Sequence, residues 1–330
     1  MPKHMHTPKL TSFSVSNCSS LQSMPEHMHA PNLTSFSVSN CISLRSMPKH
    51  MYTPKLTSFS VSNCNSLQSL PEHIRTPKLT SNCKGFQSMP KHMHTPKLTS
   101  FSVSNCNSLQ SMPDHMHSPN LTSFSVSECN SLQSMPEHMH APNLTSFSIS
   151  NCNSLQQMPE QMNMLLTSLE TLEISCCPKV ESFPNVGLPP SLKKLLIQKC
   201  DRLTVHTDWG LNNMALLTCL TIKGGCSNVN SFPDEGLLPA SLTIIQISEF
   251  PVLQTLNLKG LQDLALLKSL QINSCDFLRS FSVEGTLPSS LSSLNITGHS
   301  CLTQLCQKDV GEYWPKIRHI QIREINGDII

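Results

Sequence analysis

A phrase of nine residues, repeated almost unchanged through the first half of the chain, sets the main constraint on its fold. Leu-Thr-Ser-Phe-Ser-Val-Ser-Asn-Cys begins at Leu10 and returns, with few changes, at Leu33, Leu56, Leu98, Leu121 and Leu144. The units step by 23 residues, with one step of 19, and they start at Met1, Met24, Met47, Leu70, Met89, Met112, Met135 and Met158. Units this short bury apolar residues by stacking on one another, and a stacked array presents an extended binding surface.

Each unit carries a fixed apolar pattern. It reads LxxLxLxxCxxLxxM, with Phe, Val and Met in place of some leucines, at Leu10, Phe13, Val15, Cys18, Leu21 and Met24. The alternation in Leu-x-x-Phe-x-Val predicts a short strand with one buried face, and the period is typical of leucine-rich repeats. We therefore predict an α/β repeat solenoid, a leucine-rich-repeat horseshoe. Each repeat of 19–26 residues should place one parallel strand on the concave face and mostly turns or short helical turns on the convex face.

The chain has two sections built on this skeleton. Residues 1–165 hold near-identical 23-residue repeats, whereas residues 166–330 keep the apolar positions with diverged letters, from the motif at 169–174 to the motif at 291–296. We expect a last strand over 317–322 to close the core. Because a solenoid core extends along one axis, the two sections should form one continuous solenoid of 14 repeats.

Two irregularities lead to further expectations. The fourth repeat reads Leu79-Thr-Ser-Asn-Cys83 and lacks the Phe-Ser-Val-Ser of its neighbours, so we predict a local fault or kink near residues 79–86. The chain begins inside a repeat with no amphipathic cap, and terminal repeats need a polar outer face. We therefore expect another segment to precede Met1.

The patterns of cysteine and of charge limit the cellular compartment of the protein and the classes of partner that it can bind. The cysteines of residues 1–165 recur once per repeat, from Cys18 to Cys152, so we interpret them as reduced, buried residues that follow each strand. The chain has no run of 18 apolar residues and no charged-then-apolar leader, which predicts no membrane span, no signal peptide and a cytoplasmic location. The net charge is +2 and the basic residues are scattered, so we expect no nucleic-acid partner.

Motifs for catalysis and cofactors are missing from the sequence. It contains no phosphate-binding Gly-x-x-x-x-Gly-Lys-Ser/Thr, no Gly-x-Ser-x-Gly and no His-Glu-x-x-His, so we predict no enzyme activity and no cofactor. Met5 and its equivalents should fill the core between paired histidines. Stacked His-Met-His pairs could hold Zn²⁺ or Cu²⁺. However, Tyr52 and Arg75 replace the second histidine in two repeats, and no acidic or thiol ligand recurs beside the pairs. We therefore interpret the histidines as solvent-facing and predict no metal site.

The outward strand positions are the candidate binding surface, because solenoids use their concave face for partners. In residues 1–165 these positions are a nearly invariant set of serines and threonines, which offers little discrimination. In residues 166–330 they vary in charge and polarity, as specific recognition requires. The predicted partner-binding residues are Glu170, Glu173, Lys193, Lys194, Gln198, Thr221, Lys223, Gln246, Lys268, Gln271, Asn273, Arg318 and Gln321.

The second section also resembles a known family. Phe-Pro, Gly-Leu-Pro and Ser-Leu recur at fixed spacing in 183–200 and 231–242, and Tyr-Trp-Pro-Lys-Ile lies at 313–317. These phrases resemble the repeat region of plant disease-resistance proteins of the coiled-coil, nucleotide-binding, leucine-rich-repeat (NLR) type. The resemblance implies a cytoplasmic protein-recognition and autoinhibitory module. Its partner would be a pathogen effector, a guarded host protein or the family's nucleotide-binding domain, and this sequence contains no such domain. Two alternatives stay open, an adaptor that recruits substrates to a ubiquitin ligase and a gene fragment without independent function.

Overall fold

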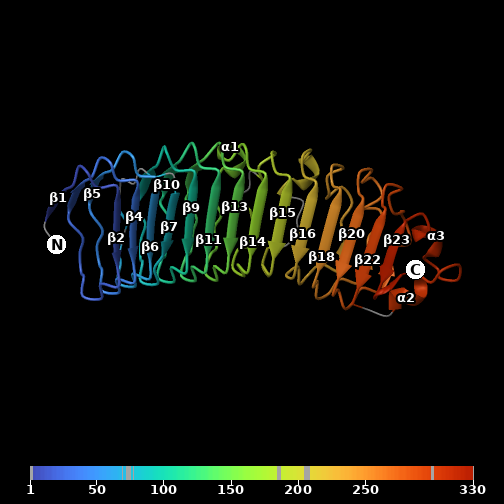
Figure 1. Cartoon of the computed structure of the whole chain (residues 1–330). Coiled ribbons are helices and arrows are strands. Elements are labelled where there is room, and N and C mark those ends of the chain that lie inside the picture. Colours follow the sequence, from blue (N-terminus) through green and yellow to red (C-terminus); the bar gives the residue numbers. More distant parts are fainter. Residues whose placement is uncertain are drawn as a thin grey trace. The chain divides into compact units, whose positions relative to one another are not determined.

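The computed structural model describes residues 3–68, 70–71, 76, 78–183, 187–203, 209–298 and 301–329. The chain divides into two compact units, Met1–Leu169 and Glu170–Ile330. In each unit successive coils add one strand apiece to a long, mainly parallel sheet (Figure 1). The predicted leucine-rich-repeat solenoid, with one parallel strand per repeat, is thus confirmed.

The long sheet of the first unit has seven strands in sequence order. They are β2 (Ser12–Ser16), β4 (Ser35–Ser39), β6 (Ser58–Ser62), β7 (Lys78–Asn82), β9 (Ser100–Ser104), β11 (Ser123–Ser127) and β13 (Ser146–Ser150). Outside β7, each residue pairs with its copy in the next coil, so that Phe124 lies beside Phe101 and Phe147. Their rings stack at 4.9 Å between centroids. The period-2 alternation therefore produces continuous apolar columns in the core.

The residues after each strand explain the Asn-Cys signature. Asn40 has a φ of 53°, in the left-handed region that asparagine tolerates better than most residues. The same conformation is found at the equivalent position of five other coils, at Asn17, Asn63, Asn105, Glu128 and Asn151. This turn directs Cys41 into the core, where its thiol donates a hydrogen bond to the Ser39 carbonyl at 3.4 Å. Cys41 to Cys152 are buried free thiols, as predicted, whereas Cys18 in the first coil is exposed.

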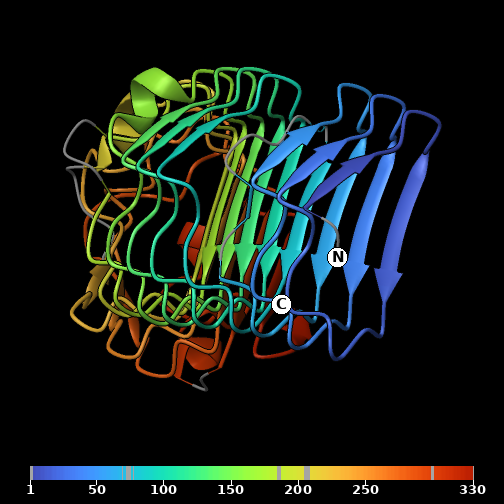
Figure 2. The ribbon, with the colours of Figure 1, turned by 90° about the vertical axis from the view of Figure 1, so that its left-hand side faces the viewer.

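In six coils of the first unit, the side opposite the long sheet differs from the expected turns. The His-Met-His segments form short strands in two parallel sheets, one of β1 (His4–His6), β3 (His27–His29) and β5 (His50–Tyr52), the other of β8 (His92–His94), β10 (His115–His117) and β12 (His138–His140). Figure 2 shows these short arrows and the long-sheet arrows on different sides of the first coils. Because the coils have nearly the same sequence and length, each short strand pairs in register with its copy in the next coil. The central methionine points inward as predicted, with Met116 1% exposed.

The predicted fault in the fourth repeat is wrong. β7 pairs with both neighbours, and Leu79 and Ser81 occupy the places of Phe and Val. Ser58 pairs with Lys78, 20 residues on, and Lys78 with Ser100, 22 residues on, against 23 in a regular repeat. Upstream residues with the same alternation thus replace the missing ones.

The long sheet of the second unit begins with six strands predicted from the sequence. They are β14 (Thr171–Ser175), β15 (Lys194–Gln198), β16 (Cys219–Lys223), β18 (Ile244–Ser248), β20 (Ser269–Asn273) and β22 (Ser293–Thr297). Leu195 and Ile197 of β15 are each 1% exposed, and the equivalent residues of the other five strands are also buried. Beyond this sheet, the two-residue strands β17 (Ser231–Phe232), β19 (Thr255–Leu256) and β21 (Ser280–Phe281) form a parallel sheet of their own.

The predicted closing strand over 317–322 is also wrong. Its first residue, Ile317, ends the helix α3 (Trp314–Ile317), and the strand β23 begins only at Ile322 (Ile322–Ile325). Pro315 lies in the first turn of α3, a position that proline favours. Ile325 is buried whereas Ile322 is 60% exposed. β24 (Asp328–Ile329) then pairs antiparallel with β23 and ends the sheet.

Helices in the described residues are single turns. Besides α3 they are α1 (Met162–Leu165), the 3₁₀ turn η2 (Leu211–Asn213) and α2 (Cys301–Leu305). Within the described ranges, no helix has the length and apolar character needed to span a membrane.

Candidate functional site

The candidate site is the outward face of the long sheet in Glu170–Ile330, meaning the side chains that alternate with the core residues. β15 illustrates how the face is built. Leu195 and Ile197 are buried, so Lys194, Leu196 and Gln198 point to the other side and are exposed or half-buried. A side-chain period of 2 fixes this division on every strand of the sheet.

Parallel pairing aligns the outward residues into columns that run across the strands. The middle column contains Glu173, Leu196, Thr221, Gln246, Gln271, Asn295 and Glu324. Gln246 is its centre, because it accepts a hydrogen bond from the Thr221 hydroxyl at 3.2 Å and donates its amide to Gln271 Oε1 at 3.0 Å. Farther along the column, Asn295 donates to Glu324 Oε2 at 2.7 Å. Hydrogen bonds thus link Thr221, Gln246 and Gln271, and separately Asn295 and Glu324, into a polar ladder within this column.

Charged residues border this ladder. Lys193 Nζ lies 2.7 Å from Glu170 Oε1, and Lys223 Nζ lies 3.4 Å from Glu249 Oε1. Exposed pairs of this kind contribute about 0–1 kcal/mol each to stability. Lys194 and Lys268 are exposed and have no carboxylate partner among the residues that the structure describes. These two ammonium groups are therefore available to an acidic partner.

Most of the predicted partner-binding residues lie on or beside this face. Those on the strands point outward, namely Glu173, Lys194, Gln198, Thr221, Lys223, Gln246, Gln271 and Asn273. Glu170, Lys193 and Lys268 precede a strand and lie at the rim of the face. Arg318 and Gln321 are placed wrongly by the prediction, because they lie in the turn between α3 and β23.

Asn295, Thr297 and Glu324 also belong to the face and were not predicted from the sequence. Asn295 and Thr297 project outward from β22, and the Thr297 hydroxyl donates to Asn273 Oδ1 at 3.0 Å. The alternation around Leu294 and Ile296 already implied their positions. Glu324 was missed because the register of the last strand was wrong.

The corresponding face of Met1–Leu169 has little chemical variety. Its middle outward column is Ser14, Ser37, Ser60, Thr80, Ser102, Ser125 and Ser148. Beside it the hydroxyls of a threonine series donate to the preceding coil, as Thr122 does to the Thr99 carbonyl at 2.9 Å. Apart from Lys78 on β7, the strand positions of this face are neutral and nearly the same in each coil.

Comparison with known proteins gives one informative similarity in sequence. No protein-family model matches the chain. A candidate disease resistance protein of Arabidopsis thaliana is 36% identical over 143 residues, which are 43% of this chain and 10% of that protein. The matched part of the chain thus spans about a tenth of the length of this relative.

Solved structures with a similar backbone are leucine-rich-repeat proteins. The circular repeat protein CroV588 aligns over 88% of this chain and 56% of its own, at 13% identity and a TM-score of 0.37. A repeat protein of Bacteroides ovatus aligns over 86% and 78%, at 16% identity and a TM-score of 0.32. The internalin InlF of Listeria monocytogenes aligns over 86% and 88%, at 15% identity and a TM-score of 0.31.

Proposed function

We propose that this chain is a non-catalytic protein-recognition module that binds its partner through the outward face of Glu170–Ile330. The observation that carries the proposal is the contrast between the two units. The same strand positions hold repeated serines in the first unit but Lys194, Leu196, Gln246 and Gln271 in the second. A face with mixed charge, amide and apolar groups can discriminate between partners, whereas a uniform hydroxyl face offers little basis for discrimination.

The biological setting we propose is plant defence. The similarity to a candidate disease resistance protein of Arabidopsis supports it, as does the spacing of Phe-Pro, Gly-Leu-Pro and Ser-Leu in the second unit. In this proposal the module works in the cytoplasm as the repeat region of an NLR-type resistance protein. It recognises a pathogen effector or a guarded host protein, or it restrains a nucleotide-binding domain.

The partner should carry exposed carboxylates that match the free ammonium groups. Lys194 lies on β15 and Lys268 immediately before β20, with β16 and β18 between these two strands. At the strand spacing of about 4.8 Å, three steps separate them by roughly 14 Å. An acidic segment of a few residues can span this distance, and the Gln246 ladder between them can bind its backbone.

The test uses the purified chain and nucleotide-binding domains of plant resistance proteins, with binding measured by biolayer interferometry. The Lys194→Glu, Lys268→Glu double variant should bind at least tenfold more weakly, because each charge reversal at an interface costs about 1 kcal/mol or more. The matched control is Ser123→Glu, since Ser123 holds the position on β11 that Lys194 holds on β15. Equal losses in both variants, or none in the double variant, would contradict the assignment of the face.

A further inference from the structure

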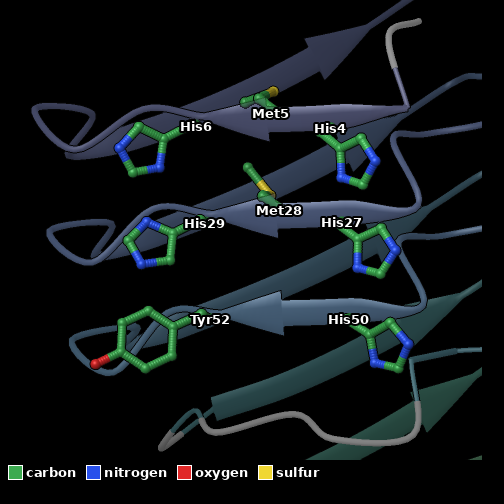
Figure 3. Close-up of a pocket in the computed structure, with 8 residues that line it drawn as sticks. All are labelled: His4, Met5, His6, His27, Met28, His29, His50 and Tyr52. Carbon is green, nitrogen blue, oxygen red and sulfur yellow. The ribbon is translucent and has the colours of Figure 1, made fainter.

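The histidine pairs of the first unit form ordered columns. His4, His27 and His50 stack with ring centroids 4.8 and 4.9 Å apart, and His6 stacks on His29 at 4.7 Å (Figure 3). Met5 and Met28 lie between the two columns, and Tyr52 continues the second column. The groove along these strands has a volume of about 410 Å³.

A second set of columns lies on β8, β10 and β12. His92, His115 and His138 stack at 5.1 and 4.9 Å. His94, His117 and His140 stack at 5.0 and 4.9 Å. Residues 72–75 of the fourth repeat, which include Arg75, lie outside the described residues. The histidines are therefore grouped into four columns, two on each short sheet.

The ring nitrogens in these columns are available as ligands. Among the described residues, no hydrogen bond or ion pair engages the side chains of these histidines. The neutral imidazole, which has one ring nitrogen with a free lone pair, is the form that binds metal ions.

Adjacent rings in a column lie close enough to reach the spacing that a shared metal ion needs. Zn²⁺ binds imidazole nitrogen at about 2.0–2.1 Å, so two nitrogens on a tetrahedral ion lie about 3.3 Å apart. Stacked rings at 4.7–5.1 Å reach this separation when they tilt toward each other about their side-chain torsions. The first and third rings of a column, about twice as far apart, cannot share an ion. No group of three or more His, Cys, Asp or Glu suited to a metal lies in the described ranges, so water would complete each site.

We propose that each histidine column binds one exchangeable divalent transition-metal ion between two adjacent imidazoles. The ion is of the class that prefers imidazole nitrogen, represented by Zn²⁺, Ni²⁺ and Cu²⁺. Two protein ligands with the remainder water make an open, reversible site on the surface. This differs from the closed, four-ligand site of a structural zinc. The lack of a recurring acidic or thiol ligand beside the pairs rules out a closed site of this kind but not an open site with two imidazole ligands.

Charges near the columns do not prevent binding. Lys91, Asp114 and Glu137 immediately precede His92, His115 and His138 in the second set. In the first set Lys49 pairs with Glu26 at 3.8 Å, so this lysine is partly neutralised. Acidic and basic residues thus alternate or nearly balance in number along each set. The affinity for the metal ion is therefore set by the imidazoles.

The experiment is calorimetric titration of the full chain with Zn²⁺ at pH 7.5, with Mg²⁺ as the hard-ion control. Cys18→Ser serves as the background because the exposed Cys18 thiol is itself a zinc ligand. We expect four Zn²⁺ per chain with micromolar affinity and no Mg²⁺ binding. Removing the central rings with His115→Ala and His117→Ala should lower the stoichiometry from four to two, because the outer rings are too far apart to share an ion.

Two matched variants make the test specific. His92→Ala with His94→Ala removes as many imidazoles but leaves adjacent pairs on β10 and β12, so four ions should still bind. His6→Ala should remove one ion, and adding Tyr52→His should restore it by pairing position 52 with His29. Circular dichroism checks that each variant folds. Millimolar affinity, or equal effects of the central and end double variants, would show adventitious binding only and overturn the proposal.

Discussion

Ser81 gives a direct measure of the cost of the shortened fourth repeat. It lies in the inward column between Val61 and Val103 and is 2% exposed. Its hydroxyl makes one long contact, 3.8 Å to the Cys106 sulfur, which is a weak hydrogen bond. We predict that Ser81→Val stabilises the first unit, although serine is the residue that this coil carries.

The magnitude follows from the buried groups. Valine adds two methyl groups in place of the hydroxyl, a gain of about 0.8 kcal/mol per buried carbon group. It also removes a buried hydroxyl with poor hydrogen bonding, which costs about 1–3 kcal/mol. Fitting the larger side chain offsets part of this gain, by about 1 kcal/mol if the site is tight. The net expectation is a stabilisation of about 1.5–3.5 kcal/mol.

The reverse change in an intact repeat is the matched control. Val126 occupies the same column position between Val103 and Ile149 and is fully buried. Val126→Ser should cost about 2–4 kcal/mol, because it removes two buried methyl groups and leaves a hydroxyl without its preferred partners. Native-state hydrogen exchange of the β6, β7 and β9 amides reports the local free energy of opening, since solenoid repeats open regionally. A destabilising Ser81→Val would refute the placement of Ser81 in the core column.

Four further outcomes are expected. Gly85→Ser should cost more than about 2 kcal/mol by urea unfolding, because a Cβ there would lie 1.4 Å from the Asn65 carbonyl oxygen; an unchanged midpoint would contradict this close approach. Leu195→Asp should abolish cooperative melting of the coils around β15, since it buries a charge, and an unaltered melt would disprove the register. The folded-state pKa of His117 lies below the unfolded value of about 6.5, so the unfolded chain binds more protons, and stability measured by urea titration should fall as pH drops below about 6.5. Maleimide under native conditions should modify Cys18 far faster than Cys41, because burial also raises the Cys41 pKa; equal rates would count against the buried column.

The positions of most strands could be predicted from the sequence because the repeats supply the register. Each long-sheet strand from β14 to β22 lies where Leu-x-x-Leu-x-Ile places it, and the buried residues are those of the pattern. The outward residues then follow from the alternation, which is why Lys194, Gln246 and Gln271 were found. Hydrogen bonds along the polar ladder were not predictable, because they depend on side-chain torsions.

The fourth repeat shows why aligning it with its neighbours residue by residue gives the wrong strand position when four residues of the repeat are missing. Alignment treats Leu79 as the residue before the strand, and it predicts a gap in the core where Phe and Val are missing. The sheet instead selects residues by alternation, and Lys78 to Asn82 supply one apolar and one small inward residue. Keeping the hydrogen-bonded ladder continuous outweighs the loss of apolar area at Ser81.

The position of the last strand, β23, was predicted wrongly for a different reason, because the sequence does contain a signal for it that the repeat pattern obscured. Asn326 and Gly327 have φ values of 55° and 89°, as a two-residue hairpin turn requires. Asn-Gly between Ile325 and Asp328 is a strong short-range hairpin signal, and it places β23 directly before the turn. The isoleucines at 317 and 320 fitted the repeat pattern, but a spacing of three residues suits a helical turn as well.

The two units also show why a recognition face needs divergent repeats. In identical coils every outward residue stacks on its own copy at about 4.8 Å, where two like charges repel by about 0.9 kcal/mol even at the dielectric constant of water. A lysine at Ser123 and at each of its copies would add this repulsion at every interface, whereas neutral serine adds none. In the second unit Lys194 has Cys219 as its neighbour, and Lys193 lies against Glu170. Charges for specific binding can therefore accumulate only where neighbouring repeats differ, which favours Glu170–Ile330 over the uniform face of Met1–Leu169 as the site of recognition.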